Sequence, residues 1–158
     1  MKKLLLSVVC LSFLMAVFAN GQKIFIGDDG LYYDSLNNPY TGIYLEYFED
    51  GTIKLEFSIV EGYKDGISKL FYQSGIVNEV RSYKGGVKHG AWITYNQAGI
   101  KTGEANYSMD LKNGKWYTWD ENGTLRCEMS YLDGEKVGTW IIFDERGKAI
   151  KTKDYSKE

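Results

Sequence analysis

Apolar and polar residues alternate along this chain in a pattern that repeats every 24 residues. Each period opens on a glycine, continues as a short alternating run, passes a polar turn that ends in a second glycine, and closes with another alternating run. The two glycine series are Gly42, Gly66, Gly90, Gly114 and Gly138, and Gly51, Gly75, Gly99, Gly123 and Gly147. Alternation with a period of two predicts β-strands, and a fixed longer period predicts a repeat architecture. We therefore expect five tandem units over residues 42–155, each with two strands and two turns.

Aromatic residues occupy fixed positions, counted from the first glycine of each unit. At position five stand Tyr47, Phe71, Tyr95, Trp119 and Phe143. At position two stand Tyr44, Ser68, Trp92, Trp116 and Trp140, and at position seventeen stand Ile59, Tyr83, Tyr107, Tyr131 and Tyr155. Aromatic and β-branched side chains suit a pleated surface, so these columns favour an all-β fold. We expect the position-five aromatics to be structural and to hold neighbouring hairpins together.

The first turn of each unit is predicted by polar residues followed by glycine, as in Glu-Asn-Gly at 121–123. This pattern favours a three-residue hairpin loop with its glycine in the left-handed conformation. Such a loop pairs position five with eleven, three with thirteen and one with fifteen. All odd positions would then share an apolar face. The tryptophan column would lie on the even face, among polar neighbours such as Thr94, Glu104 and Ser130.

The second turn is predicted where one unit meets the next. The residues placed there are Asp65-Gly66, His89-Gly90, Asn113-Gly114 and Val137-Gly138. Short polar connections join antiparallel neighbours, so the units should form a meander. About ten strands at roughly 4.8 Å each would give a sheet on the order of 50 Å across. The expected fold is an elongated, twisted, mostly single-layer antiparallel sheet of tandem hairpins.

The start of the chain predicts export. Residues 1–19 have the pattern of a signal peptide, because two lysines precede an apolar run without charge. Cleavage is predicted after Ala19 or, alternatively, after Gly21. The run is short for a membrane-spanning helix, so an uncleaved anchor is the less favoured reading. We therefore expect the protein to be periplasmic, on the cell surface or secreted.

The two flanks of the repeats are expected to differ from them. Residues 22–41 should form an N-terminal cap with short strands near 23–26 and 31–33, since terminal units of repeat arrays close off an exposed edge. Residues 151–158 carry five charges in eight positions and are expected to fray, with a polar tail at 156–158.

Composition and charge narrow the classes of function. Hydrophobic residues make up 44% of the chain and aromatic residues 15%, which is too apolar for a disordered protein. The leader holds two of the 19 basic residues and none of the acids, so the mature chain has 17 basic and 21 acidic residues, a net of −4. This charge disfavours nucleic acid and anionic lipid, leaving membrane contact to the leader alone. Cys127 remains as a single cysteine after cleavage, so no disulfide supports the mature fold.

The segment Gly114–Gly123, Gly-Lys-Trp-Tyr-Thr-Trp-Asp-Glu-Asn-Gly, carries a resemblance to a known family. A Gly-x-Trp-x-x-aromatic-x-x-x-Gly pattern at this period resembles the MORN repeat in its bacterial variant form, and many such proteins are labelled YwqK-type toxin–antitoxin antitoxins. The resemblance covers residues 39–155, and Ser68 and Lys101 depart from its apolar pattern. It implies stacked β-hairpins that serve as a scaffold for protein contacts and sometimes for lipid contacts. The antitoxin label implies a partner inside the cell, and the predicted leader departs from that.

The same segment is also similar to choline-binding cell-wall repeats. In those repeats, aromatic rings of adjacent hairpins cage a quaternary ammonium by cation–π attraction. The repeats are typically nearer twenty residues long, and only the unit that opens at Gly114 matches them well. A glycan or choline-type binding module of the cell envelope is therefore the alternative interpretation.

Few residues in the sequence are candidates for catalysis or metal binding. His89 is the only histidine and shares its column with Asp65 and Asn113, so a turn role explains it. Cys127 shares a strand column with Leu55 and has no predicted base beside it. We therefore expect no enzyme activity, no metal and no cofactor.

The tryptophan column offers the candidates for recognition. The residues proposed for partner binding are Trp92, Trp116, Trp140 and Tyr44. An aromatic stripe rimmed by polar residues often marks an interaction site. A stripe that packs on itself is the alternative, because a single-layer sheet has few other ways to cover its second face. The sequence predicts an exported, non-enzymatic scaffold that binds a protein or a copy of itself.

Overall fold

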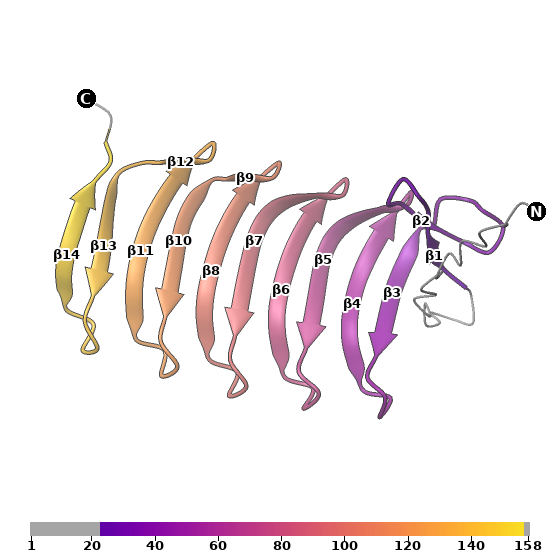
Figure 1. The fold of residues 1–158 in the computed structure, drawn as a ribbon, viewed down its shortest axis with the longest axis horizontal. Helices are drawn as coiled ribbons and strands as arrows, with labels where there is room; N and C mark the ends of the chain where they lie inside the picture. The colour runs from indigo at the N-terminus through magenta and orange to yellow at the C-terminus, as the bar shows by residue number, and fades with distance from the viewer. Residues whose placement is uncertain (1–22, 157–158) are drawn as a thin grey trace, which may run out of the picture.

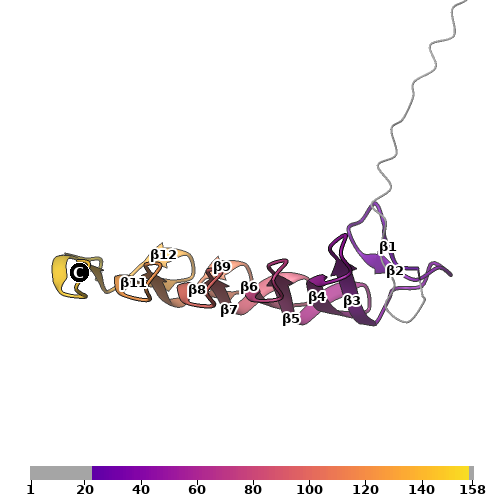
Figure 2. The same cartoon turned by 90° about the horizontal axis from the view of Figure 1, so that it is seen from below.

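The computed structural model describes residues 23–156, so the predicted leader, its cleavage site and the last two residues lie outside the described range. Every regular element in this range is a β-strand. Twelve strands form one antiparallel sheet, and two strands near the N-terminus form a second, small sheet. Figure 1 shows the long axis of the large sheet running across its strands, and Figure 2 shows that it is a single twisted layer. The described residues contain no helix of the length and hydropathy that a membrane span requires.

The large sheet follows the chain in order, which confirms the predicted meander. Its main strands are β3 (Gly42–Tyr47), β4 (Ile53–Val60), β5 (Tyr63–Phe71), β6 (Val77–Lys84), β7 (Val87–Tyr95), β8 (Lys101–Ser108), β10 (Gly114–Trp119), β11 (Leu125–Leu132), β13 (Thr139–Phe143) and β14 (Ala149–Asp154). The short strands β9 (Leu111–Lys112) and β12 (Glu135–Lys136) pair with β8 and β11. The second sheet pairs β1 (Phe25–Ile26) with β2 (Tyr32–Tyr33).

The first turn of each unit is the predicted three-residue loop. In the fourth unit, the backbone N–H of Asp120 donates to the carbonyl of Thr124 at 3.0 Å, which closes a loop over 121–123. Gly123 at the end of this loop has φ +84°, in the left-handed region that favours glycine. The equivalent hydrogen bond closes the loop in all five units.

A β-bulge follows this loop and changes the predicted register. Trp119 pairs with Leu125, as position five with eleven should. Thr118, however, pairs with Cys127, so Arg126 is an extra residue in its strand. The same shift occurs in the other four units. The predicted pairings of three with thirteen and one with fifteen are therefore wrong, and the observed pairs are three with fourteen and two with fifteen.

The bulge decides which side chains share a face. Beyond it, the even positions of the first strand lie on the same side as the odd positions of the second strand. The tryptophan column therefore shares its face with the position-seventeen tyrosines, and we name this side the ladder face. Glu104 pairs with Ile93, and Ser130 pairs with Lys115. Both Glu104 and Ser130 therefore lie on the opposite side of the sheet, which we name the open face. Their predicted place beside the tryptophans is wrong.

The second turn lies four residues before the predicted position. Its two central residues have positive φ at all four junctions between units, which is typical of a type I′ hairpin. These residues are Glu61-Gly62, Gly85-Gly86, Met109-Asp110 and Asp133-Gly134. Met109-Asp110 lacks a glycine, so the sequence gives no uniform signal for this turn.

The unit-opening glycine bends a strand instead of forming the turn. Gly90, for example, has φ +93° and lies within β7, where three residues on β7 oppose a single residue of β6. The chain between the turn and this glycine thereby leaves the sheet plane, and Figure 2 shows these segments on one side of the sheet. We name residues 61–64, 85–88, 109–112 and 133–136 the bent hairpins.

The two ends of the sheet differ in structure: a cap packs against the first unit, and a paired strand ends the last. Residues 23–41 pack against the first unit, where Ile24 is 2% exposed in a cluster with Tyr44, Phe57 and Ile59. At the other end, β14 pairs with β13 along its whole length. The expected fraying of residues 151–154 is therefore wrong, because five backbone pairs hold this charged strand in the sheet.

Candidate functional site

Alternating tyrosine and tryptophan rings cross the ladder face as one continuous row. Neighbouring ring centroids are 4.8–5.5 Å apart, within the range of favourable aromatic contacts. The members of this aromatic ladder are Tyr83, Trp92, Tyr107, Trp116, Tyr131, Trp140 and Tyr155. Each ring contact lies within one hairpin or between two neighbouring hairpins, so the ladder packs the units together.

The indole N–H groups of the ladder are bound within the protein. Each donates to a backbone carbonyl of the preceding unit, at position sixteen. The pairs are Trp92 with Ser82 at 3.0 Å, Trp116 with Asn106 at 3.0 Å, and Trp140 with Ser130 at 3.1 Å. These hydrogen bonds fix the ring orientations and leave the indole donors engaged by the protein's own backbone.

A lysine column covers the ladder, and the sequence analysis missed it. Lys64, Lys88, Lys112 and Lys136 recur every 24 residues, two before the unit glycine of the second to fifth units, so the period itself marked them. The bent hairpins carry these lysines over the rings. The Lys112 ammonium lies 4.5 Å from the Trp116 centroid and 4.7 Å from that of Tyr131, and Lys88 and Lys136 have equivalent places. This geometry is that of a cation–π interaction.

The first two units lack the tryptophan and build a different core. Tyr44 is 8% exposed and packs on Phe57 with centroids 4.8 Å apart, while Tyr32 of the cap contacts both rings. Burial raises the pKa of Tyr32 to about 12, with smaller contributions from Tyr44, Tyr83 and Glu46. Of the four residues predicted to bind a partner, Tyr44 is buried and the three tryptophans are half-buried in the ladder.

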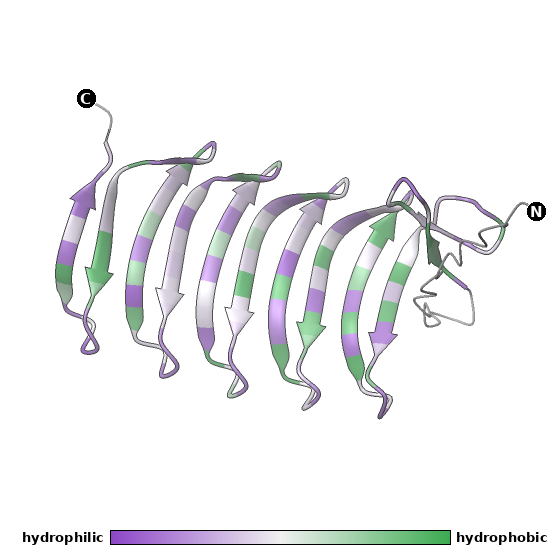
Figure 3. Cartoon of the chain, in the orientation of Figure 1, coloured by the Kyte–Doolittle hydropathy of each residue, from purple (hydrophilic) through white to green (hydrophobic). Residues whose placement is uncertain are grey.

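The open face exposes aliphatic residues in the N-terminal half of the sheet. Ile43 is 45% exposed and Ile67 is 47% exposed. A shallow apolar groove of about 290 Å³ lies on the same face, between the second and third units. Its lining residues are Ile76, Val77, Val80, Tyr95 and Gly99. Figure 3 shows hydrophobic colour recurring along the strands of this half.

The position-five aromatics also lie on the open face. Trp119 packs against Tyr117 with centroids 5.5 Å apart, and the Lys101 ammonium lies 4.3 Å from the Trp119 ring. Tyr95 lines the apolar groove. Among the described residues, Trp119 is the one position-five aromatic with a ring contact, so this column forms no row comparable to the ladder.

The acidic residues of the open face are paired with lysines. Glu128 accepts from Lys115 at 2.6 Å, and Glu104 accepts from Lys101 at 2.9 Å. Glu56 lies 3.8 Å from Lys69. Because each carboxylate has a basic partner, this surface presents balanced charge within an apolar setting.

The candidate catalytic residues do not come together. His89 lies in β7, directly after a bent hairpin, and its Nδ1 is buried without a hydrogen-bond partner among the described residues. Cys127 is a half-buried free thiol in β11, paired across the hairpin with Thr118. In the described range, no three His, Cys, Asp or Glu side chains are arranged to hold a metal ion.

Comparison with known families agrees with this architecture. The family described as MORN repeat variant matches residues 40–59, 64–84 and 112–133. Each match begins two residues before a unit glycine, so Lys64 and Lys112 fall inside the family pattern. A search among curated proteins found no match. The 24-residue hairpins, the aromatic columns and the three matched segments together place the chain in the MORN-repeat variant family.

Proposed function

We propose that this protein is an exported, non-enzymatic scaffold that binds a protein partner through the open face of its sheet. The observation that carries the proposal is the exposure of aliphatic side chains there. Contiguous exposed apolar surface often marks a protein interaction site. Within the described residues, no segment covers the open face as the bent hairpins cover the ladder face. A second copy of the chain is one such partner.

The ladder face supports a structural role better than a binding role. Its indole donors are engaged, and its cation positions hold the chain's own lysines. A choline group would have to displace an ammonium such as that of Lys112, and this favours protein binding over the choline-type alternative. The antitoxin alternative requires a partner inside the cell, and the predicted leader at 1–19 favours a partner outside it.

The proposal is tested by affinity capture from the native cell envelope with a charge placed on each face. Ile67→Lys changes the open face at a residue 47% exposed, and Ile142→Lys changes the ladder side at a residue 42% exposed. Because nearly half of each isoleucine is exposed to solvent, both variants should fold. We expect Ile67→Lys to reduce the captured partner at least tenfold and Ile142→Lys to leave it within twofold.

Sedimentation of the same three proteins separates the two kinds of partner. A wild-type dimer that Ile67→Lys converts to a monomer identifies the partner as a second copy. Partner capture that responds equally to both substitutions would contradict binding through the open face.

A further inference from the structure

The aromatic ladder is interrupted at one place, where Ser68 stands in the column of tryptophans. Within the described residues, no ring contact joins Phe57 of the first unit to Tyr83 of the second. Lys64 bridges the interruption instead. Its ammonium lies 4.7 Å from the Phe57 centroid, 5.6 Å from that of Tyr83 and 6.0 Å from that of Tyr32.

Lys64 differs from the other lysines of its column. Lys112 lies over a tryptophan and the tyrosine that follows it. Since the second unit has no indole, the Lys64 ammonium lies nearest Phe57, on the side of the cap. The interruption therefore leaves a lysine between two aromatic groups that are not in contact.

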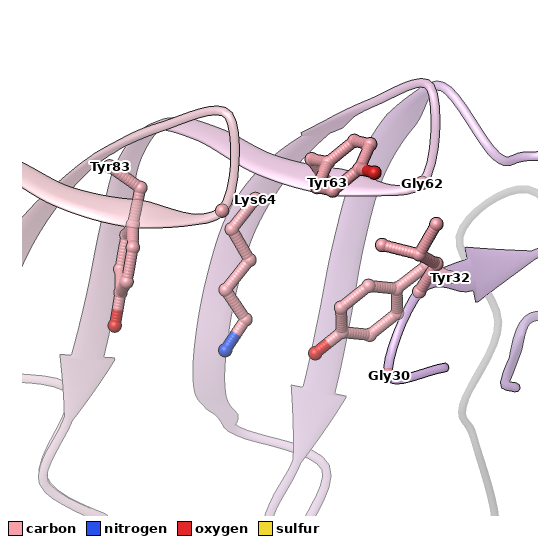
Figure 4. Close-up of a pocket in the computed structure, with 8 residues that line it drawn as sticks. Gly30, Tyr32, Gly62, Tyr63, Lys64 and Tyr83 are labelled. Carbon is pink, nitrogen blue, oxygen red and sulfur yellow. The ribbon is translucent and has the colours of Figure 1, made fainter. Parts of the chain in front are cut away.

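A pocket of about 350 Å³ lies beside this lysine, and we name it the cap pocket. Three segments build it: the cap, the first bent hairpin and the second hairpin. Its lining residues are Gly30, Leu31, Tyr32, Gly62, Tyr63, Lys64, Tyr83 and Gly86. Figure 4 shows the Lys64 side chain extending between the rings of Tyr83 and Tyr32.

The walls of the cap pocket are held by the backbone. The N–H of Tyr32 donates to the carbonyl of Gly62 at 3.0 Å, and the N–H of Gly86 donates to the carbonyl of Lys64 at 2.8 Å. A Cβ on Gly62 would lie 3.2 Å from the Tyr32 carbonyl, so the cap and hairpin are in close contact. These hydrogen bonds within the backbone shape the pocket, as is usual for small-molecule sites.

The charge of the cap pocket is positive. None of its lining residues is acidic, and no described carboxylate lies within ion-pairing distance of Lys64. Burial lowers the pKa of Lys64, and the nearby Arg81 lowers it further. Arg81 is itself paired with Glu79. A half-buried ammonium without a counterion favours an anionic ligand.

We propose that the cap pocket binds a small carboxylate carried on a single six-membered ring. The carboxylate would pair with the Lys64 ammonium, and the ring would lie against the tyrosine side chains. A volume of about 350 Å³ suits one ring rather than a longer ligand. An aromatic acid and a sugar acid share this chemistry, since both present a flat or CH-rich ring to an aromatic wall. The site is independent of protein binding by the open face.

Calorimetric titration of the purified protein tests this site with two matched pairs of ligands. Phenylacetate and glucuronate are the anions, and phenylacetamide and methyl glucoside are their neutral counterparts. We expect saturable binding of at least one anion, at least tenfold tighter than its neutral counterpart. Binding of phenylacetate alone identifies an aromatic acid, binding of glucuronate alone identifies a sugar acid, and binding of both identifies a general ring-carboxylate site.

Variants locate the binding. Lys64→Met keeps the aliphatic stem and removes the charge, so it should weaken the anion at least tenfold, while Lys64→Arg should stay within a few fold. Lys112→Met is the matched control in the same column and should change binding less than twofold. Thermal unfolding of each variant verifies its fold. The proposal is overturned if neither anion binds, if the neutral ligands bind equally well, or if a folded Lys64→Met protein binds as wild type does.

Discussion

Both faces of this sheet carry columns of aromatic residues, yet the fold uses them differently. On the ladder face, the chain bends back at each unit glycine and lays a lysine over a continuous row of rings. On the open face, aliphatic residues and position-five aromatics remain partly solvated. Trp116 and Trp119 belong to the same strand, three residues apart, and illustrate the two outcomes.

This difference shows how a single-layer sheet obtains a core. An isolated sheet must bury one face against another element. Within residues 23–156 there is no helix, and the small β1–β2 sheet belongs to the cap beside the first unit. The bent hairpins supply that cover from within each unit. An aromatic stripe that resembles a ligand site is thereby used as the interior of the protein. The face without such cover is the one that we propose for partner binding.

The largest expected effect comes from removing a ladder ring. Trp116→Ala should lower the free energy of unfolding by about 3 kcal/mol, because it deletes two ring contacts, a lysine contact and a partly buried hydrogen bond. Trp119→Ala, on the open face of the same strand, should cost about 1 kcal/mol. Urea denaturation of both variants measures the difference. Equal losses would remove the distinction between the faces.

The cap end of the ladder face should make stability depend on alkaline pH. The pKa of Tyr32 is raised to about 12 in the folded protein, against 10.0 for an ordinary tyrosine. Between these values the folded protein keeps a proton that the unfolded chain has lost, so stability falls as the pH rises from 10 to 12. The contribution, complete below pH 10, is about 2 kcal/mol after allowance for partial exposure.

Tyr32→Phe isolates this contribution, since it removes the titrating hydroxyl and keeps the ring. Lys64 acts in the opposite direction. Because its pKa is lowered in the folded protein, its charged form reduces the stability of the fold, and this loss of stability disappears as the pH rises toward 10.5. Unfolding free energies of the wild type and Tyr32→Phe at pH 9, 10, 11 and 12 are compared. We expect the variant to lose less stability over this range. Parallel curves for the two proteins would contradict burial of Tyr32.

A smaller effect should follow from neutralising a lysine of the column. Lys112→Met keeps the stem over the rings and deletes the cation–π attraction to Trp116 and Tyr131. We expect a loss of about 1 kcal/mol in the free energy of unfolding. Lys115→Met removes an ammonium that pairs with a glutamate of the open face, and this variant should lose less than half as much stability. A larger loss at Lys115 would show that ion pairs of the open face matter more than the ladder contacts.

The repeat, the three-residue first turn and the all-β meander could be predicted from the sequence, because glycine spacing and alternation report directly on local geometry. The bulge at Arg126 could not be predicted from the sequence. A single extra residue does not change the composition, yet it changes which residues of the two strands lie on the same face. The second turn was misplaced because the unit glycine suggested a turn, whereas its positive φ serves a bend within a strand.

The candidate site also has one part that could be predicted from the sequence and one part that could not. The lysine column could have been predicted from its period of 24 residues, although its contact with the rings depends on the bend. The cap pocket could not, because it depends on how residues 30–32 pack against the first bent hairpin. Register and long-range packing therefore decided the role of the aromatic residues, after local pattern had established the strands.

The central claim is that the tryptophan column is the interior of the protein and that the open face is its free surface. Exchange of the four indole N–H groups with solvent, followed by NMR on nitrogen-15-labelled protein, tests it directly. Trp92, Trp116 and Trp140 donate to backbone carbonyls, whereas the Trp119 indole has no hydrogen-bond acceptor among the described residues. Three slowly exchanging indoles and a fast Trp119 are predicted. Four indoles that exchange at one rate would contradict the account.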